Sequence, residues 1–311
     1  MSEVDIQKEL FRNADLSQHA MHDKDTAYLS VHLNKVTGMR DVPGFHVEVE
    51  ETEDGINANI MLEEGVVIKK PVHMCFGIIP ENGRQQINMK VHLHKHSKIN
   101  IRAHCVFPNA VDIVHAMDAE ITLDEGAEYT YHETHVHGET GGIKVIPKAV
   151  VNLGPYARFK TDFELLEGRV GLIDIDYHTN CGPYSTLEMN AKIYGKGNDV
   201  IKILESGSLN GEGARGVLTS YIAVRDNARA EINNKLIAKA PGARGHVDCK
   251  EIIKDNATAM AVPIVEVQDP RAHVTHEAAI GAVDNRQLET LMARGLDEET
   301  ATDLIIAGLL S

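Results

Sequence analysis

The stretch "RDNARA", residues 225–230, is followed by a near copy, "KDNATA", at residues 254–259. In each, a small residue, a polar residue and a third residue open a run in which apolar and polar positions alternate. A looser form of this triplet recurs through the middle of the chain, with its central residue at positions 98, 128, 158, 199, 229 and 258. The steps between successive copies are 30, 30, 41, 30 and 29 residues.

A repeat of about thirty residues made of strands and Asn, Gly or Asp turns is typical of a β-solenoid, in which each coil supplies two strands and two turns. We expect the step of 41 to contain an insertion of about ten residues, with "HTNCGPYS" (178–185) as part of its loop. The alternative fold is a large antiparallel sandwich whose strands happen to have similar lengths.

Alternation with a period of two begins near Gly44, and "INANIML" (56–62) and "QINMKVHL" (86–93) are clear examples. It persists for about two hundred residues. The sequence therefore predicts an N-terminal helical segment (1–43), a β-helix core (44–280) and a C-terminal helical segment (281–311).

Helical patterns flank the predicted core. In "DIQKELFRNA" (5–14), the spacing of Ile6, Leu10 and Phe11 predicts a short surface helix. After the core, Asp284 is placed to cap one helix and Asp297 to cap the next. Two short helices joined by a tight turn should follow, with Gly295 at the end of the first.

The last predicted helix has an apolar stripe made of Leu304, Ile305 and Leu309. Either this helical hairpin packs back on the end of the solenoid, or it presents an apolar groove to a partner.

Composition limits the function. At 311 residues and 43% apolar content, the chain can bury about three quarters of its unfolded surface without disulfides. A net charge of −15 argues against nucleic acid or an anionic membrane as the partner. The sequence has no apolar run long enough to span a bilayer and no signal-peptide pattern, so we expect a cytoplasmic protein. The four cysteines, which we expect to be buried core thiols, form no C-x-x-C pair.

Several histidine groups could bind a metal ion. "VHLHKH" (91–96) places His92, His94 and His96 on one face of a predicted strand, about 7 Å apart in succession. In "YHETHVH" (131–137), His135 and His137 share a face. Histidines on a strand surface are often simply solvated, so metal binding by these residues stays open. The chain has no H-E-x-x-H, G-x-S-x-G or Walker motif, which counts against a hydrolytic enzyme.

The C-terminal stretch "GHVDCKEIIKDNATAMAVPIVEVQDPRAHVTHEAAIGAVDNRQLETLMARGLDEETATDLIIAGLL" (245–310) resembles the C-terminal core of the SufB/SufD family of iron–sulfur cluster assembly proteins. The resemblance is specific over this stretch and extends more weakly back to about residue 44. It suggests a compact, archaeal-type member.

The resemblance implies a right-handed parallel β-helix followed by helices. It also implies a non-catalytic scaffold that pairs through the end of its β-helix and docks a SufC-like ABC ATPase through its last helices, here by Leu304, Ile305 and Leu309. His276 and Glu277 fall on the family's H-E-A motif, near the expected subunit interface and a transient iron–sulfur cluster. "MAVPIVEVQ" (260–268) is the expected dimerisation segment.

One position departs from the SufB pattern, because Ala257 stands where a cysteine is expected. Either Cys249 replaces that cysteine as the thiolate ligand, together with His276 and Glu277, or the chain is a SufD-like adaptor without its own cluster. A β-strand metalloenzyme is a more distant alternative. The sequence does not decide the cluster type, the use of a flavin, or whether the partner is an identical chain or a paralogue.

Overall fold

The computed structural model describes residues 3–14 and 23–310. Within these residues the strands form two sheets, one of ten strands and one of nine. The ten-stranded sheet contains β1 (Tyr28–His32), β2 (Lys35–Arg40), β5 (Val72–Gly77), β7 (Lys98–Phe107), β9 (Glu128–His137), β11 (Arg158–Leu165), β13 (Thr186–Gly195), β15 (Arg215–Val224), β17 (Arg244–Ile253) and β19 (His273–Gly281). The nine-stranded sheet contains β3 (Phe45–Glu51), β4 (Gly55–Leu62), β6 (Asn82–Leu93), β8 (Asp112–Leu123), β10 (Ile143–Leu153), β12 (Leu172–Cys181), β14 (Val200–Leu209), β16 (Arg229–Ala238) and β18 (Thr258–Val267).

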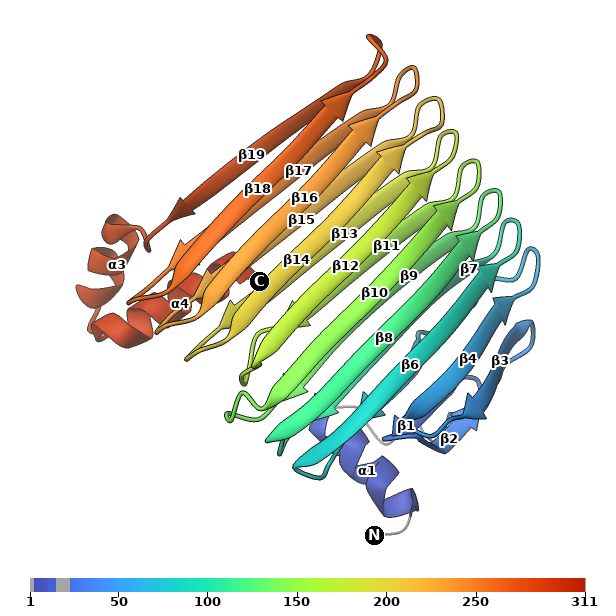
Figure 1. Ribbon diagram of the computed structural model, residues 1–311, viewed down its shortest axis with the longest axis horizontal. Coiled ribbons are helices and arrows are strands. Elements are labelled where there is room, and N and C mark those ends of the chain that lie inside the picture. The colour runs from blue at the N-terminus through green and yellow to red at the C-terminus, as the bar shows by residue number, and fades with distance from the viewer. Residues whose placement is uncertain (1–2, 15–22, 311) are drawn as a thin grey trace.

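From β4 onward the chain passes from one sheet to the other, and each strand pairs in parallel with the strand two further along (Figure 1). Arg158 of β11, for example, pairs with Glu128 of β9 on one side and with Thr186 of β13 on the other. The fold is therefore the predicted β-solenoid and not an antiparallel sandwich. Antiparallel pairing occurs in the described residues between β1 and β2 and between β3 and β4.

The step of 41 residues marks a change of sheet and contains no insertion, so that expectation was wrong. The first three triplets open β7, β9 and β11, whereas the last three lie at the starts of β14, β16 and β18 in the other sheet. Through this region both sheets advance by the same 28 residues, from 158 to 186 and from 172 to 200. "HTNCGPYS" is the end of β12 and its turn into β13.

Five of the six triplets recur because they mark a tight turn that ends in a small buried residue, namely Ser97, Ala127, Ala157, Ala228 or Ala257. Ala127 and Ala157 are completely buried, and the residues before them, Gly126 and Tyr156, have φ of +67° and +59°. Asp226 has the same left-handed conformation (φ +59°) in "RDNARA". Aspartate adopts this conformation more readily than most residues, which explains the sequence of that turn.

The N-terminal helix α1 (Glu3–Asn13) covers part of the outer face of the ten-stranded sheet. Leu10 and Phe11 pack there against Cys75 and Val106. Strands begin earlier than predicted, because β1 and β2 both lie within the segment 1–43 that was expected to be helical. The run "YLSVH" is five residues long and lies among polar residues, so its sequence pattern is too short to indicate a strand.

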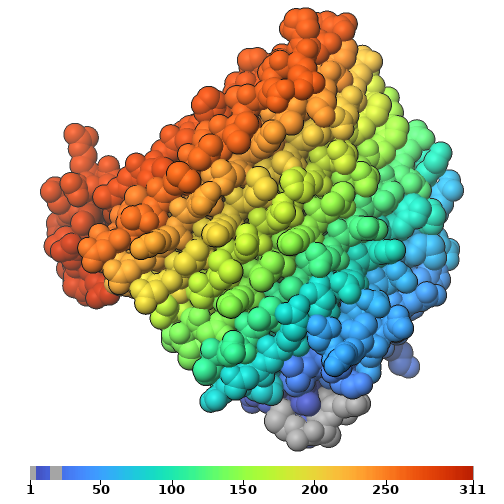
Figure 2. Space-filling view, viewed as in Figure 1, coloured from blue at the N-terminus to red at the C-terminus, as the bar shows by residue number. Residues whose placement is uncertain are grey.

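At the other end, α3 (Asn285–Met292) and α4 (Glu298–Leu310) form the predicted hairpin. The Asp284 side chain accepts a hydrogen bond from the Gln287 backbone N–H (2.9 Å), and Asp297 accepts one from Thr300 N–H (2.8 Å). Gly295 has φ +97° at the end of the first helix, as expected. In the space-filling view the hairpin is a separate lobe at one corner of the stacked strands (Figure 2).

Helix α4 packs one face against the solenoid. Ile306 and Leu310 are buried against Tyr194 of β13 and Ala223 of β15. Arg225, at the end of β15, binds Glu299 (3.0 Å) and Asp303 (3.4 Å) of the helix. The hairpin therefore packs back on the solenoid, which is one of the two alternatives that the sequence left open.

Candidate functional site

Cys249, His276 and Glu277 lie in the last two strands of the ten-stranded sheet. Cys249 of β17 pairs with Ala278 of β19, and Val247 pairs with His276. The coil length thus brings positions near 249 and 277 into neighbouring strands, as the repeat predicted. Neighbouring strands are about 4.8 Å apart.

Strand alternation divides the three residues between two faces. His276 is the partner of the buried Val247 and lies on the interior side, the same side as Cys249. Glu277 is the partner of Asp248, and both lie on the outer side. Glu277 therefore points away from Cys249 and His276, because consecutive residues of a strand point in opposite directions.

The Cys249 thiol is completely enclosed in the interior. The Asn234 amide donates to its sulfur over 3.6 Å and to Ser220 Oγ over 2.7 Å. Burial raises the pKa of the Cys249 thiol to about 12. Iron and zinc bind the thiolate, so this thiol becomes a good ligand only when its surroundings change.

Two buried carboxyl groups near Cys249 were missed in the sequence. Burial raises the pKa of Glu205 to about 8, and burial together with the Asp248 charge raises the pKa of Glu251 to about 7. Glu251 lies two residues beyond Cys249 on the same interior face of β17. The alternation in "IKILESGSL" and "HVDCKEI" puts both glutamates at interior positions, and that signal could have identified them.

The solenoid interior is open at this end of the described chain, because β18 and β19 are the terminal strands of their sheets (Figure 1). Val267 and Ile280 lie on the interior side, yet they are 47% and 43% exposed. Met260 and Ile264 of β18 are also exposed. The last two strands thus expose apolar side chains on both of their faces.

A second group of ligand-type side chains lies in the middle of the interior. Glu133 accepts hydrogen bonds from His135 Nε2 (2.8 Å) and from the Cys105 thiol (3.5 Å). His135 Nδ1 lies 3.0 Å from His137 Nε2, and His137 Nδ1 lies 3.1 Å from the Arg169 carbonyl oxygen. The predicted pairing of His135 and His137 on one face is confirmed, but that face is the buried one.

This hydrogen-bond chain determines where the protons lie. The Arg169 carbonyl can only accept, so His137 Nδ1 donates to it, and burial keeps the pKa of His137 well below its ordinary value. The neutral His137 then accepts from His135 Nδ1–H. Burial alone would raise the pKa of Glu133, but the hydrogen bond and charge of His135 hold it below the ordinary value. Glu133 is therefore held as a carboxylate inside the solenoid, where it accepts hydrogen bonds from His135 and Cys105.

The histidines of "VHLHKH" separate into two places. His92 and His94 both approach Asp124 near the C-terminal ends of β6 and β8. His96 is in the turn after β6 with φ +56°, so the expectation that it shares a strand face with them was wrong. The strand ends at Leu93 because a turn to the other sheet begins there.

The predicted apolar stripe of α4 faces away from the solenoid. Leu304 is 53% exposed, and Ile305 and Leu309 are half-buried. Leu304 and Ile305 line an open groove of about 430 Å³. Leu291 and Arg286 of α3 form its other side. The hairpin thus packs back through one face and leaves an apolar groove on another.

Comparison with known proteins identifies the chain. Residues 78–309 match the model of the SUF system FeS cluster assembly SufBD core domain. The chain belongs to the SufBD family. It is 38% identical to an iron–sulfur cluster assembly SufBD family protein of Methanocaldococcus jannaschii, covering 89% of this chain and 88% of that protein. It is 35% identical to a SufBD family protein of Pyrococcus horikoshii, covering 89% and 84%.

Bacterial SufB is more distant. The iron–sulfur cluster assembly protein SufB of Bacillus subtilis is 24% identical over 81% of this chain and 54% of its own length. SufBD proteins take part in iron–sulfur cluster assembly. Among the described residues of this SufBD chain, no helix is both long and apolar enough to cross a bilayer.

In this SufBD chain Cys249 lies in the strand before the turn that contains Ala257, the position at which the resemblance led us to expect a cysteine. Ala257 is buried in the turn between β17 and β18. Cys249 lies four residues before the end of β17, which corresponds to about 13 Å of strand. A cluster bound by Cys249 would therefore lie deeper in the solenoid than one bound at position 257.

Proposed function

We propose that this SufBD-family chain is a non-catalytic cytoplasmic scaffold on which an iron–sulfur cluster is assembled transiently at the open end of the solenoid. The observation that supports this best is that Cys249 and His276 lie on the same interior side of the last two strands of the ten-stranded sheet. Thiolate and imidazole are both ligands for iron–sulfur clusters. Glu277 adds a carboxylate on the outer side of β19, which would favour the approach of iron(II) to this end.

Cluster binding requires the last coil to move. The Cys249 thiol is enclosed and protonated, and its register partner Ala278 belongs to the only strand of the described ten-stranded sheet beyond β17. Displacement of β19 would admit iron and water, and the thiol could then lose its proton. A coil at the end of a solenoid opens more easily than an internal coil, because it has a neighbour on one side only.

We assign dimerisation to the terminal strands. β19 offers a row of backbone groups along its outer edge, and exposed apolar side chains lie beside it. Pro263 interrupts the backbone donors of β18, so β19 is the better edge for pairing with a second chain. A homodimer is the simplest form, and a paralogue could replace one chain. Light scattering should give a dimer at micromolar concentration, and a monomer would contradict this assignment.

The groove between α3 and α4 is proposed as the docking site for a SufC-like ATPase. Leu304 and Ile305 supply its apolar surface, and both can change without disturbing the buried face of α4. The double variant Leu304→Ser/Ile305→Ser should lose capture of the ATPase in a pull-down. Leu204→Ser, which alters an exposed leucine of β14, is the matched control and should bind normally. Undiminished capture by the double variant would rule out this groove.

A SufD-like adaptor without its own cluster is the second candidate. It is favoured by Ala257 at the position of the expected cysteine and by the enclosure of Cys249. Anaerobic reconstitution with iron(II) and sulfide separates the two functions. The scaffold should turn brown and show sulfur-to-iron charge-transfer absorbance, whereas a dimer that stays colourless would support the adaptor.

A further inference from the structure

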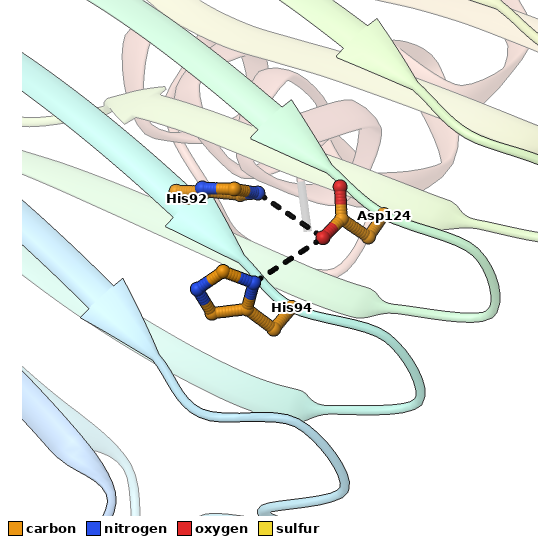
Figure 3. A group of neighbouring side chains, drawn as sticks. All are labelled: His92, His94 and Asp124. Carbon is orange, nitrogen blue, oxygen red and sulfur yellow. Dashed lines mark hydrogen bonds and ion pairs between the residues drawn. The ribbon is translucent and has the colours of Figure 1, made fainter.

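Two histidines and an aspartate meet where two neighbouring internal strands of the nine-stranded sheet end, far from the open end of the solenoid. His92 is near the end of β6, His94 follows that strand, and Asp124 follows β8 in the next coil. Figure 3 shows both imidazole rings directed at one carboxylate oxygen. His92 Nε2 is 3.2 Å and His94 Nδ1 is 3.3 Å from Asp124 Oδ2.

The spacing of the three donor atoms suits a shared metal ion. Two ligands about 2.1 Å from one ion, at 90–109° to each other, are about 3.0–3.4 Å apart. The measured separations from Asp124 Oδ2 fall in this range, and all three donor atoms lie within 4.8 Å of one another. Two imidazoles and one carboxylate with open positions are a donor set for Fe²⁺ and Zn²⁺.

The backbone of the solenoid holds the three residues in place before any ion arrives. His94 N–H donates to the Leu62 carbonyl (3.0 Å), and Asp124 N–H donates to the Leu93 carbonyl (2.9 Å). Ser97 Oγ donates to the His94 carbonyl (2.6 Å) and fixes the turn. Binding would therefore order few additional groups, which favours affinity.

The local surroundings leave the site accessible. The side chains of His92, His94 and Asp124 are 45%, 37% and 32% exposed, so water or another ligand can complete the coordination. The nearby cation Lys95 pairs with Glu125 over 3.5 Å. In the preceding coil, Glu63 binds His46 over 2.7 Å.

We propose that His92 Nε2, His94 Nδ1 and Asp124 Oδ2 form a binding site for a divalent first-row transition-metal ion of the Fe²⁺ or Zn²⁺ class. The site is separate from the proposed cluster site. Five strand spacings separate β8 from β18, which corresponds to about 24 Å, so one ion cannot contact both. The inference stands whether or not Cys249 binds a cluster.

The test is calorimetric titration of the full chain with Zn²⁺, repeated with Co²⁺ under visible spectroscopy. The chain has 17 histidines, some of which could bind Zn²⁺ weakly elsewhere. The quantity to compare is therefore the number of Zn²⁺ sites that each variant loses relative to wild type. Wild type should show one site that His94→Ala and Asp124→Asn each remove or weaken by more than about tenfold. His178→Ala is the control, since His178 forms an exposed pair with Asp176 (2.8 Å) and should keep the site.

A second measurement locates the ion without substitutions. Fe²⁺ with ascorbate and oxygen should oxidise the peptide containing His92 and His94 in preference to the one containing His178. Unchanged Zn²⁺ stoichiometry and affinity in both His94→Ala and Asp124→Asn would overturn the proposal. Equal oxidation of the two peptides would also overturn it.

Discussion

Cys249 of β17 and Ala278 of β19 are register partners in the last parallel strand pair of the ten-stranded sheet. The thiol is therefore one strand away from the open end, and the small side chain of Ala278 is its neighbour on that side. The same pairing places His276 on the interior side and Glu277 on the outer side. Access to Cys249 thus depends on the stability of the last coil.

Alkylation should distinguish Cys249 from the other thiols. All four cysteines are buried, but β17, which holds Cys249, is separated from the end of its sheet by β19 alone, whereas Cys181 in β12 and Cys105 in β7 lie several strands from that end. Opening of the last coil requires less free energy than global unfolding, so Cys249 should react with iodoacetamide faster than either. Mass spectrometry of timed samples measures the order. Reaction of all three at the same rate would indicate that only global unfolding exposes Cys249.

The pH dependence of stability should change when Glu205 becomes glutamine. The folded-state pKa of about 8 is higher than that of an unfolded glutamate, so the folded state binds more protons between about pH 4.5 and 8. Stability therefore falls as the pH rises through this window. Glu205→Gln should raise the free energy of unfolding at pH 8 by on the order of 3 kcal/mol, with little change at pH 4, as measured by urea denaturation.

Glu133→Gln is the matched control, because it should change the free energy of unfolding in the opposite direction. The pKa of Glu133 is lowered in the folded protein, so its carboxylate stabilises the fold above the unfolded pKa. That stability is lost as the pH falls through the lowered folded value. Glu133→Gln should therefore destabilise the protein at pH 7. Equal responses of the two variants would show that the interior does not distinguish these carboxyl groups.

Loosening α4 should be separable from changing its groove. Ile306→Ala removes a buried contact with Tyr194 and Ala223 and should speed hydrogen exchange throughout α4, because a truncation of this kind costs about 2–5 kcal/mol. Leu304→Ser alters an exposed residue and should leave exchange nearly unchanged. Identical exchange in the two variants would mean that Ile306 does not hold the helix on the solenoid.

The sequence predicted the solenoid because each coil repeats the same chemistry. Alternating apolar residues and small residues after tight turns are local signals, and the structure confirms both. The change of sheet hidden in the 41-residue step was not predictable in this way, because turns at both ends of the coil use similar triplets.

The sites were harder to predict because they depend on register. The sequence does not identify Asp124 as a ligand, because Asp124 approaches His92 and His94 only when β6 and β8 are paired. Once the pairing of β17 with β19 is known, strand alternation alone puts Glu277 on the face of the sheet that points away from Cys249. Glu205 and Glu251 occupy interior positions of β14 and β17, and the alternation of apolar residues in these strands is enough to predict that both carboxyl groups are buried.

The most direct test of the scaffold proposal is the iron and acid-labile sulfide content of Cys249→Ser after anaerobic reconstitution. Cys181→Ser is the matched control, because it removes another buried thiol from an internal coil. Circular dichroism and light scattering should first establish that both variants are folded and have the oligomeric state of the wild type. The scaffold proposal predicts that iron and sulfide per dimer fall sharply in Cys249→Ser and stay at the wild-type level in Cys181→Ser. Wild-type iron and sulfide in Cys249→Ser would contradict it.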